Sequence, residues 1–192
     1  AIGKEIRRFC REYHIVSFSS LIDYADEYQE EWLDYLDSHG WLVKEYLKSR
    51  TWSIEHGADV DDATLKEMAR KKIFFVPTID HNRYYVDAKD EFGFAPETMG
   101  PLRDYINRNL DTARRAHLAG VRFAMGSDAV YTMFGQNTRE LDWFKKAGLT
   151  DEQCLHAATV NGADLLGLPN DIGKLKPGFY ADIVAIEGQP WK

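Results

Sequence analysis

The feature that most constrains the fold of this chain is an alternation of short apolar runs with longer amphipathic stretches. The apolar runs lie at 51–55, 73–76 and 121–125. The helical patterns that follow them lie at 61–71, 96–119 and 136–147. Short apolar strands that alternate with helices are typical of parallel βαβ units. We therefore predict an α/β fold with a parallel sheet, in which polar groups follow each strand at its carboxyl end.

Residues at the ends of these patterns indicate where helices begin and end. Asp61 is placed to accept a hydrogen bond at the N-terminus of the first helix. Thr150 and Gln153 have the spacing of a capping box, which predicts a further helix after them. Gly120 is expected to end the long middle helix. Residues 80–95 are mostly polar, and we expect a loop there.

The first 50 residues follow a different pattern, which we predict to be mainly helical. Apolar and aromatic side chains recur at helical spacing over 21–38, and a further helical stretch spans 41–49. The apolar run 14–19 is a candidate strand. Aromatic side chains are dense between residues 24 and 46. A packed core or an oligomer surface explains such a stripe better than a ligand site does.

Charge and length exclude several classes of protein. The formal net charge of −7 disfavours nucleic acid and anionic membrane surfaces as partners, because both attract Lys and Arg. No apolar run approaches the ~20 residues of a membrane helix. The two cysteines make no disulfide framework, so a reducing compartment, the cytoplasm, is the expected location. The 192 residues fall short of the ~250 that a closed (β/α)₈ barrel usually takes.

His56 and Asp128 are the first candidates for a functional site, because each follows an apolar run. A neutral imidazole is a good zinc ligand, and a structural, hydrogen-bonded histidine is the alternative. The carboxylate of Asp128 suits a metal ligand or a general base, and a helix N-cap is the alternative. Parallel strands would bring both residues to one edge of the sheet. Together they indicate a metal-assisted hydrolase, with a metal that acidifies water and a carboxylate that moves protons.

The segment after the second apolar run is another candidate, because it is rich in side chains that bind small polar ligands. Arg83 can pair bidentately with a substrate carboxylate. His81 and Tyr84 are further candidate substrate-binding residues, and a surface loop is the alternative reading of the whole segment. Two other histidines are expected outside any site, with His117 in solvent and His156 packed in a helix.

A series of motifs over residues 52–192 resembles the metal-dependent amidohydrolase superfamily. The motifs are SIEHG at 53–57, VPTI at 76–79, GVRFAMGSD at 120–128, AATVNGA at 157–163 with LLGL at 165–168, and GKLKPGFYADIV at 173–184. Any one of them is a weak signal, whereas all of them in this order are specific. The most similar branch is the group that holds imidazolonepropionases and Xaa-Pro dipeptidase-like enzymes. The resemblance concerns the C-terminal part of that fold.

The resemblance implies a fold and the roles of two residues. Residues 51–168 would form part of a (β/α)₈ TIM-like barrel, and residues 169–192 would supply strands of a small β-sandwich. His56 would be a metal ligand at the end of barrel strand six. Asp128, at the end of strand eight, would bind metal and carry the proton of the attacking water. The cofactor would be one or two divalent ions, with zinc expected. The substrate would be a small molecule with a hydrolysable amide, such as a dipeptide or a cyclic amide.

Part of the metal site that the resemblance implies has no counterpart in this sequence. Relatives carry a His-x-His pair on strand one, often a carboxylated Lys on strand four, and a His on strand five. We therefore expect the chain to need a partner, either a second copy in a homo-oligomer or a complementing N-terminal half. Two alternatives to amide hydrolysis stay open. One is a non-catalytic oligomeric fragment, and the other is deamination by the same kind of activated water.

Overall fold

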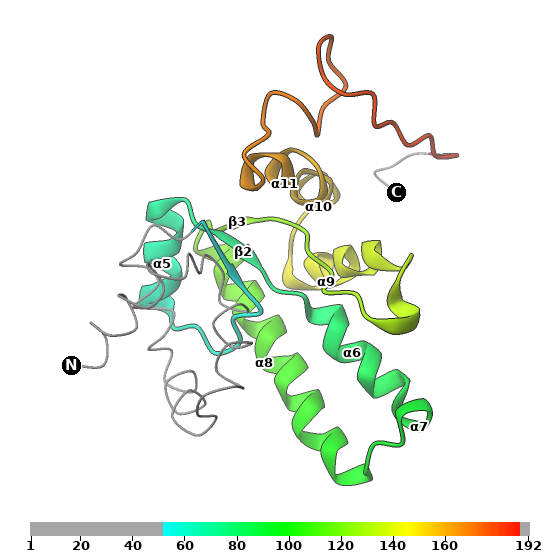
Figure 1. The fold of residues 1–192 in the computed structure, drawn as a ribbon. Helices are drawn as coiled ribbons and strands as arrows, with labels where there is room; N and C mark the ends of the chain where they lie inside the picture. Colours follow the sequence, from blue (N-terminus) through cyan, green and yellow to red (C-terminus); the bar gives the residue numbers. More distant parts are fainter. Residues whose placement is uncertain (1–51, 189–192) are drawn as a thin grey trace, which may run out of the picture.

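The computed structural model describes residues 52–188, which form an α/β arrangement of three strands and several helices (Figure 1). The strands are β1 (Ser53–Glu55), β2 (Phe74–Val76) and β3 (Arg122–Phe123). The α-helices are α5 (Asp62–Lys71), α6 (Ile79–Asp87), α7 (Lys89–Phe92), α8 (Met99–Leu118), α9 (Glu140–Ala147), α10 (Asp151–Ala158) and α11 (Val160–Leu165). Short 3₁₀ helices lie at Pro96–Thr98, Tyr131–Met133 and Asn137–Arg139. The predictions for residues 1–50 lie outside the described residues.

The strands form one parallel sheet in the order β1-β2-β3, which confirms the predicted parallel βαβ pattern for the described residues. Ile54 pairs with Phe75, and Phe75 pairs with Phe123. Helix α5 connects β1 to β2, and α6, α7 and α8 lie between β2 and β3 along the chain. Because the strands are parallel, their carboxyl ends meet at one edge of the sheet. Three strands do not test the partial (β/α)₈ barrel, which stays a prediction.

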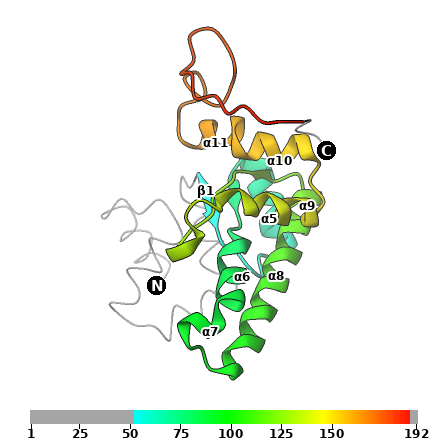
Figure 2. The same cartoon turned by 90° about the vertical axis from the view of Figure 1, so that its right-hand side faces the viewer.

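The main core lies between one face of the sheet and the helices α5, α8 and α9. The rings of Phe75 and Phe123 meet edge to face with centroids 5.6 Å apart, and Phe123 meets Phe144 of α9 at 5.3 Å. Helices α6 and α8 lie side by side in both views (Figure 1, Figure 2). The other face of the sheet carries a smaller buried cluster of Phe74, Val76 and Ala124.

The predicted helix caps form as expected. The Oδ1 atom of Asp61 accepts a hydrogen bond from the backbone N–H of Thr64 at 2.8 Å. The hydroxyl of Thr150 accepts from the backbone N–H of Gln153 at 3.2 Å, and the side chain of Gln153 accepts from the N–H of Thr150 at 2.8 Å. These bonds satisfy N–H groups that have no partner within the helix, so both helices begin where the sequence predicts.

The loop predicted over residues 80–95 is wrong, because the structure has α6 and α7 there. Arg83 pairs with Asp80 one turn before it and with Asp87 one turn after it. Such pairs stabilise a helix, and Glu140 caps the first turn of α6 from another part of the chain. The polar composition that suggested a loop instead supplies the ion pairs of a helix.

The outer edge of β3 has no strand beside it among the described residues, and neighbouring helices bond it instead. The Nδ2 atom of Asn161 in α11 donates to the backbone oxygen of Phe123 at 2.8 Å. The backbone N–H of Met125 donates to the oxygen of Ala157 at 3.0 Å. Open strand edges favour pairing with other chains. These two bonds therefore occupy part of the open edge of β3.

Residues 169–188 extend away from α11 without forming a strand (Figure 1). Several apolar side chains there are exposed, namely Leu175, Tyr180, Ile183, Val184 and Ile186. The β-sandwich that the resemblance implies for residues 169–192 stays a prediction. Within residues 52–188, no helix combines the length and apolar character needed to cross a membrane.

Gly57 lies directly after His56 at a position that requires glycine. Its φ is +59°, and an added Cβ would lie 2.6 Å from Cε2 of the fully buried Phe75. We expect Gly57→Ala to lower the free energy of unfolding by about 2–4 kcal/mol, because left-handed strain adds to overpacking. Gly93→Ala is the matched control, since Gly93 has a φ of +65° with no described heavy atom within 4 Å of its Cβ position. Equal losses in urea denaturation would contradict the packing argument.

Candidate functional site

Three residues with left-handed backbone follow the ends of the three strands. The φ angle is 60° at His56, 48° at Thr78 and 47° at Asp128. Such angles are uncommon for residues other than Gly and cost roughly 1–3 kcal/mol each. Residues in strained backbone tend to cluster at active sites, where the surrounding structure holds them. These three residues mark a candidate site at the carboxyl edge of the sheet.

His56 and Thr78 contact each other across the ends of β1 and β2. The Nδ1 atom of His56 lies 2.5 Å from the Oγ1 atom of Thr78. The backbone N–H of His56 donates to the oxygen of Val76 at 2.9 Å, which continues the pairing of the two strands. Both the backbone and the ring of His56 are therefore fixed. Thr78 lies in the candidate segment 77–85, but no role of its own is predicted for it from sequence. Its place just after a strand and a proline is the signal that points to it.

His81, in the first turn of α6, contacts Asp128 after β3. The Nδ1 atom of His81 donates to the backbone oxygen of Asp128 at 2.7 Å and lies 3.4 Å from its Oδ2 atom. A carbonyl oxygen can only accept, so this bond puts the ring proton of His81 on Nδ1. The side chain of Asp128 is 46% exposed. The start of α6 therefore links His56, through Thr78, with Asp128, through His81.

Arg83 and Tyr84, the other two sequence candidates, have partners within the protein. The Nε and Nη2 atoms of Arg83 donate to the two carboxylate oxygens of Asp80 at 2.9 and 2.8 Å, and Nη1 bonds Asp87. The buried hydroxyl of Tyr84 lies 2.5 Å from Oγ1 of Thr132. The structure thus places Arg83 in ion pairs along its own helix. A role for either side chain in binding substrate stays a prediction.

The carboxylate of Glu140 is fully buried and bonds the start of α6. Its two oxygens accept hydrogen bonds from the backbone N–H groups of Ile79 and Asp80, at 2.9 and 2.8 Å. Burial raises the pKa of Glu140 to about 8, against the effect of these N–H donors, and the charge of Asp80 adds to the rise. Glu140 is not a sequence candidate. Its spacing of four from the buried Phe144 puts a carboxylate on the apolar face of α9, which is a signal that could have found it.

Asp80 is a second buried carboxylate beside the first turn of α6, with an exposed fraction of 2%. Burial alone would raise the pKa of Asp80. Hydrogen bonds from Arg83 and Trp143, with the charges of Arg83 and Arg139, outweigh burial, so the pKa of Asp80 lies below its usual value. The Nε1 atom of Trp143 donates to Oδ1 of Asp80 at 2.9 Å. An ionised Asp80 therefore ties α6 to α9.

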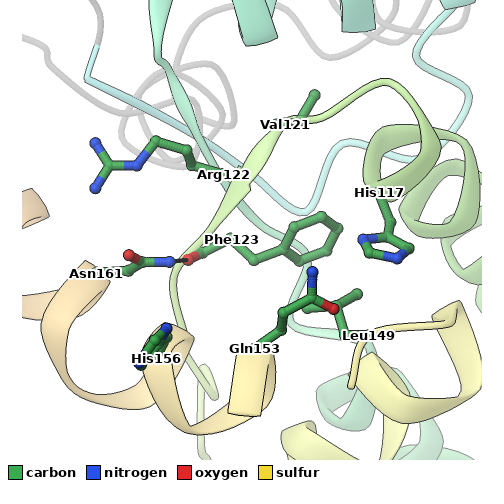
Figure 3. A pocket seen from close by; sticks show the side chains of 8 residues that line it. All are labelled: His117, Val121, Arg122, Phe123, Leu149, Gln153, His156 and Asn161. Carbon is green, nitrogen blue, oxygen red and sulfur yellow. Dashed lines mark hydrogen bonds between the residues drawn. The ribbon is translucent and has the colours of Figure 1, made fainter. Parts of the chain in front are cut away.

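A half-open hollow of about 180 Å³ beside β3 shares no residue with this site. Figure 3 shows its lining side chains, which come from the end of α8, from β3 and from the region of α10 and α11. His156 is exposed there, so the prediction that it is packed is wrong, because Cys154 and Ala157 carry the buried face of α10. His117 is half-buried rather than fully in solvent.

The described residues do not complete a metal site by themselves. Among residues 52–188, no group of three His, Cys, Asp or Glu side chains is placed to hold a metal ion. A catalytic zinc usually has three protein ligands and a water. The imidazole of His56 and the carboxylate of Asp128 are ligands of the right chemical type, but they are two at most.

Comparison with protein families decides the lineage of the chain. The sequence profile of the Amidohydrolase family matches residues 24–191. The chain belongs to the amidohydrolase family. The match begins before residue 52, where the recognisable motifs start, and so includes residues 24–51 as well. The amidohydrolase lineage is one of enzymes, specifically hydrolases, and the superfamily is generally metal-dependent.

Individual relatives agree with this assignment. An ochratoxinase from Aspergillus niger is 27% identical over 146 residues, which are 75% of this amidohydrolase chain and 30% of that protein. An imidazolonepropionase from Rubrobacter xylanophilus is 38% identical over 47 residues, 24% of this chain and 11% of that protein. The crystal structure of a Xaa-Pro dipeptidase with bound methionine superimposes with a TM-score of 0.70 at 29% identity, covering 78% of this chain and 37% of that one. The predicted family is confirmed, and the chain spans at most 37% of the length of each of these relatives.

Proposed function

We propose that this chain contributes part of the active site of a metal-dependent hydrolase that cleaves amide bonds in small molecules, such as dipeptides or cyclic amides. The observation that carries the proposal is the junction at the start of α6, where Thr78 contacts His56 and His81 bonds Asp128. This junction ties an imidazole and a carboxylate to one edge of the sheet. The names of two relatives, a Xaa-Pro dipeptidase and an imidazolonepropionase, support this substrate class.

In this proposal each residue at the carboxyl edge of the sheet has its own role. His56 is the metal ligand, and an Nδ1–H donated to Thr78 would place the ligating lone pair on Nε2. A bound divalent ion, with zinc expected, would supply a water acidic enough to ionise near neutral pH. The carboxylate of Asp128 takes a proton from the attacking water and returns it to the leaving amine. His81 bonds the backbone oxygen of Asp128 and so holds in place the backbone that carries this carboxylate.

The remaining metal ligands would come from outside residues 52–188. The chain covers 30% of the ochratoxinase and 37% of the dipeptidase, so a complementing N-terminal half is the proposed source. A second copy of the chain in a homo-oligomer is the other source. The count of two candidate ligands among the described residues also favours one alternative, a non-catalytic oligomeric fragment. Deamination by the same activated water is the alternative within the family.

Zinc binding tests the proposal. The chain assembled with an N-terminal half, or with a second copy of itself, is expected to retain zinc stoichiometrically after gel filtration. His56→Ala is expected to weaken that binding by about 100-fold, because it removes a ligand while outer-shell changes alone cost ~10–100-fold. His156→Ala is the matched control, since His156 is exposed on α10 and away from the site. Metal content by mass spectrometry and titration with zinc measure both effects.

A substrate panel completes this test. Dipeptides and cyclic amides are expected to release amines in a zinc-dependent reaction, whereas release of ammonia would indicate deamination. A chain that binds no divalent ion in any assembly and hydrolyses nothing in the panel would leave the fragment alternative. Zinc retention unchanged by His56→Ala would remove His56 from the site.

A further inference from the structure

The start of α6 lacks the cap that its sequence offers. Thr78 occupies the N-cap position of α6, and a threonine there normally accepts a hydrogen bond from an N–H of the first turn. Its side chain makes no such bond. The Thr78 hydroxyl lies against Nδ1 of His56 instead, at 2.5 Å. The first-turn N–H groups of α6 therefore need another acceptor, because buried N–H groups without one are costly.

Glu140 supplies that acceptor from a distant part of the chain. Its two oxygens bond the N–H groups of Ile79 and Asp80, and its side chain is fully buried. Asn109 of α8 holds the residue just before the cap, because its Nδ2 atom donates to the backbone oxygen of Pro77 at 2.8 Å. Two helices outside the site thus fix the segment from Pro77 to Asp80.

That segment carries both contacts of the candidate site. Thr78 and His81 lie immediately on either side of the two residues that Glu140 bonds. Thr78 reaches His56 after β1, and His81 reaches the backbone of Asp128 after β3. A shift of this segment would therefore change both contacts together.

We propose that Glu140 is a positioning residue that caps α6 in place of Thr78. It thereby releases the Thr78 hydroxyl to orient His56 and sets His81 against Asp128. The role of this positioning in catalysis rests on the proposed function. The coupling itself is a property of the folded chain and needs neither metal nor substrate to be measured.

Glu140→Gln removes one hydrogen-bond acceptor of the cap and keeps the size of the side chain. Glutamine fills the same space, but its amide nitrogen cannot accept a bond, so one N–H group of α6 loses its partner. The Thr78 hydroxyl is the side-chain acceptor at the N-cap position, and it can cap α6 only if its backbone leaves the left-handed conformation. The unpaired N–H group of α6 favours that change, which moves the hydroxyl away from His56. The ring of His56 then loses its contact with Thr78, and His81 loses its fixed distance to Asp128.

Imidazole ¹⁵N NMR of the 192-residue chain measures this coupling. In the wild type, His81 is expected in the Nδ1–H tautomer. In Glu140→Gln, the ¹⁵N signals of His56 and His81 are expected to shift toward mixed tautomers, while those of His117 and His156 stay in place. Glu152→Gln on α10 is the control, because Glu152 is exposed and far along the chain from α6. A folded Glu140→Gln chain with unchanged His56 and His81 signals, or with the signals of His117 and His156 shifted as much as those of His56 and His81, would overturn the proposal.

Thr78→Val tests the same proposal without touching Glu140, in case Glu140→Gln does not fold. Valine keeps the shape of threonine and removes the hydroxyl. The His56 signal is expected to shift, because the hydroxyl that contacts its ring is removed. Loss of a real cap would lower the melting temperature by about 2–4 °C or more for a chain of this size. A fall of that size with an unchanged His56 signal would overturn the proposal.

Activity gives an independent readout in any assembly that hydrolyses the substrate panel. Glu140→Gln is expected to lower kcat by roughly 10–100-fold and to change KM by less than about threefold, because small displacements of positioned groups act mainly on the chemical step. If no assembly is active, the proposed function fails, and the NMR result still decides the positioning role. If activity is present and kcat is unchanged in Glu140→Gln, the positioning role is wrong and the hydrolase stands.

Discussion

Replacing Asp128 with Asn is expected to lower kcat for amide hydrolysis by roughly 10²–10⁴-fold. Asparagine has the same size and shape as aspartate, but its amide cannot take a proton from water and return it to a leaving amine. The loss should appear in kcat and kcat/KM alike, because the proton moves only in the chemical step. The kinetics are measured on the assembly that hydrolyses the dipeptide and cyclic-amide panel.

The structure makes Asp128→Asn a selective change. His81 bonds the backbone oxygen of Asp128 at 2.7 Å, which the substitution keeps, and its distance to Oδ2 is the longer 3.4 Å. The left-handed backbone at position 128 also suits Asn, one of the few residues other than Gly that adopts it readily. Urea denaturation of the variant should therefore match the wild type.

Asp104→Asn is the matched control for this experiment. Asp104 is exposed on α8, and removing its charge should leave kcat within about twofold of the wild type. A kcat for Asp128→Asn within about threefold of the wild type would exclude a proton-transfer role for Asp128. A large loss in both variants would point to a charge effect on the whole surface instead.

Much of the fold between residues 52 and 168 can be predicted from local patterns. The caps at Asp61 and Thr150 join residues three apart, so their bonds follow directly from spacing. The buried strand residues Phe74, Phe75 and Val76 form a continuous apolar run, as expected for a parallel sheet covered on both faces. Helix α6 was missed because its stability comes from ion pairs of Arg83 and a distant cap, and not from an apolar stripe.

The sequence predicts a site residue only where a chemically active side chain also follows a predicted strand. His56 directly follows β1, Asp128 follows the apolar run that contains β3, and His81 lies in the segment after β2. Thr78 acts through a contact 22 residues away, and Glu140 acts through contacts 60 and 61 residues away. Such contacts depend on how helices pack, which no spacing rule describes. Only the carboxylate on the apolar face of α9 gave a sequence signal for Glu140.

Glu140 also leads us to expect that the chain loses stability as the pH rises. Burial raises the pKa of Glu140 to about 8 in the folded chain, whereas an ordinary glutamate titrates near 4.5. Between these two values the folded chain keeps a proton that the unfolded chain has lost. The free energy of unfolding should therefore fall as pH rises through this range, with a slope from Glu140 of up to about 1.4 kcal/mol per pH unit. Below 4.5 and above about 8, both states carry the same charge and the contribution is constant.

Glu140→Gln is expected to remove this slope, because glutamine does not ionise. Asp80 faces Glu140, but its lowered pKa puts its own titration below 3.8, outside the range. Arg83 and Arg139, which pair with Asp80, stay charged throughout. The slope between pH 4.5 and about 8 that the wild type shows and Glu140→Gln lacks is therefore assigned to Glu140.

Urea denaturation across the range from pH 4.5 to about 8 measures these curves. The exposed-site variant Glu152→Gln should keep the wild-type slope, since its side chain lies in solvent in both states. Parallel curves for the wild type and Glu140→Gln would contradict the prediction. They would mean that the N–H groups of Ile79 and Asp80 stabilise an ionised carboxylate by more than burial destabilises it. The cap on α6 would then carry a full negative charge at neutral pH, and its bonds would be stronger than those of a protonated acid.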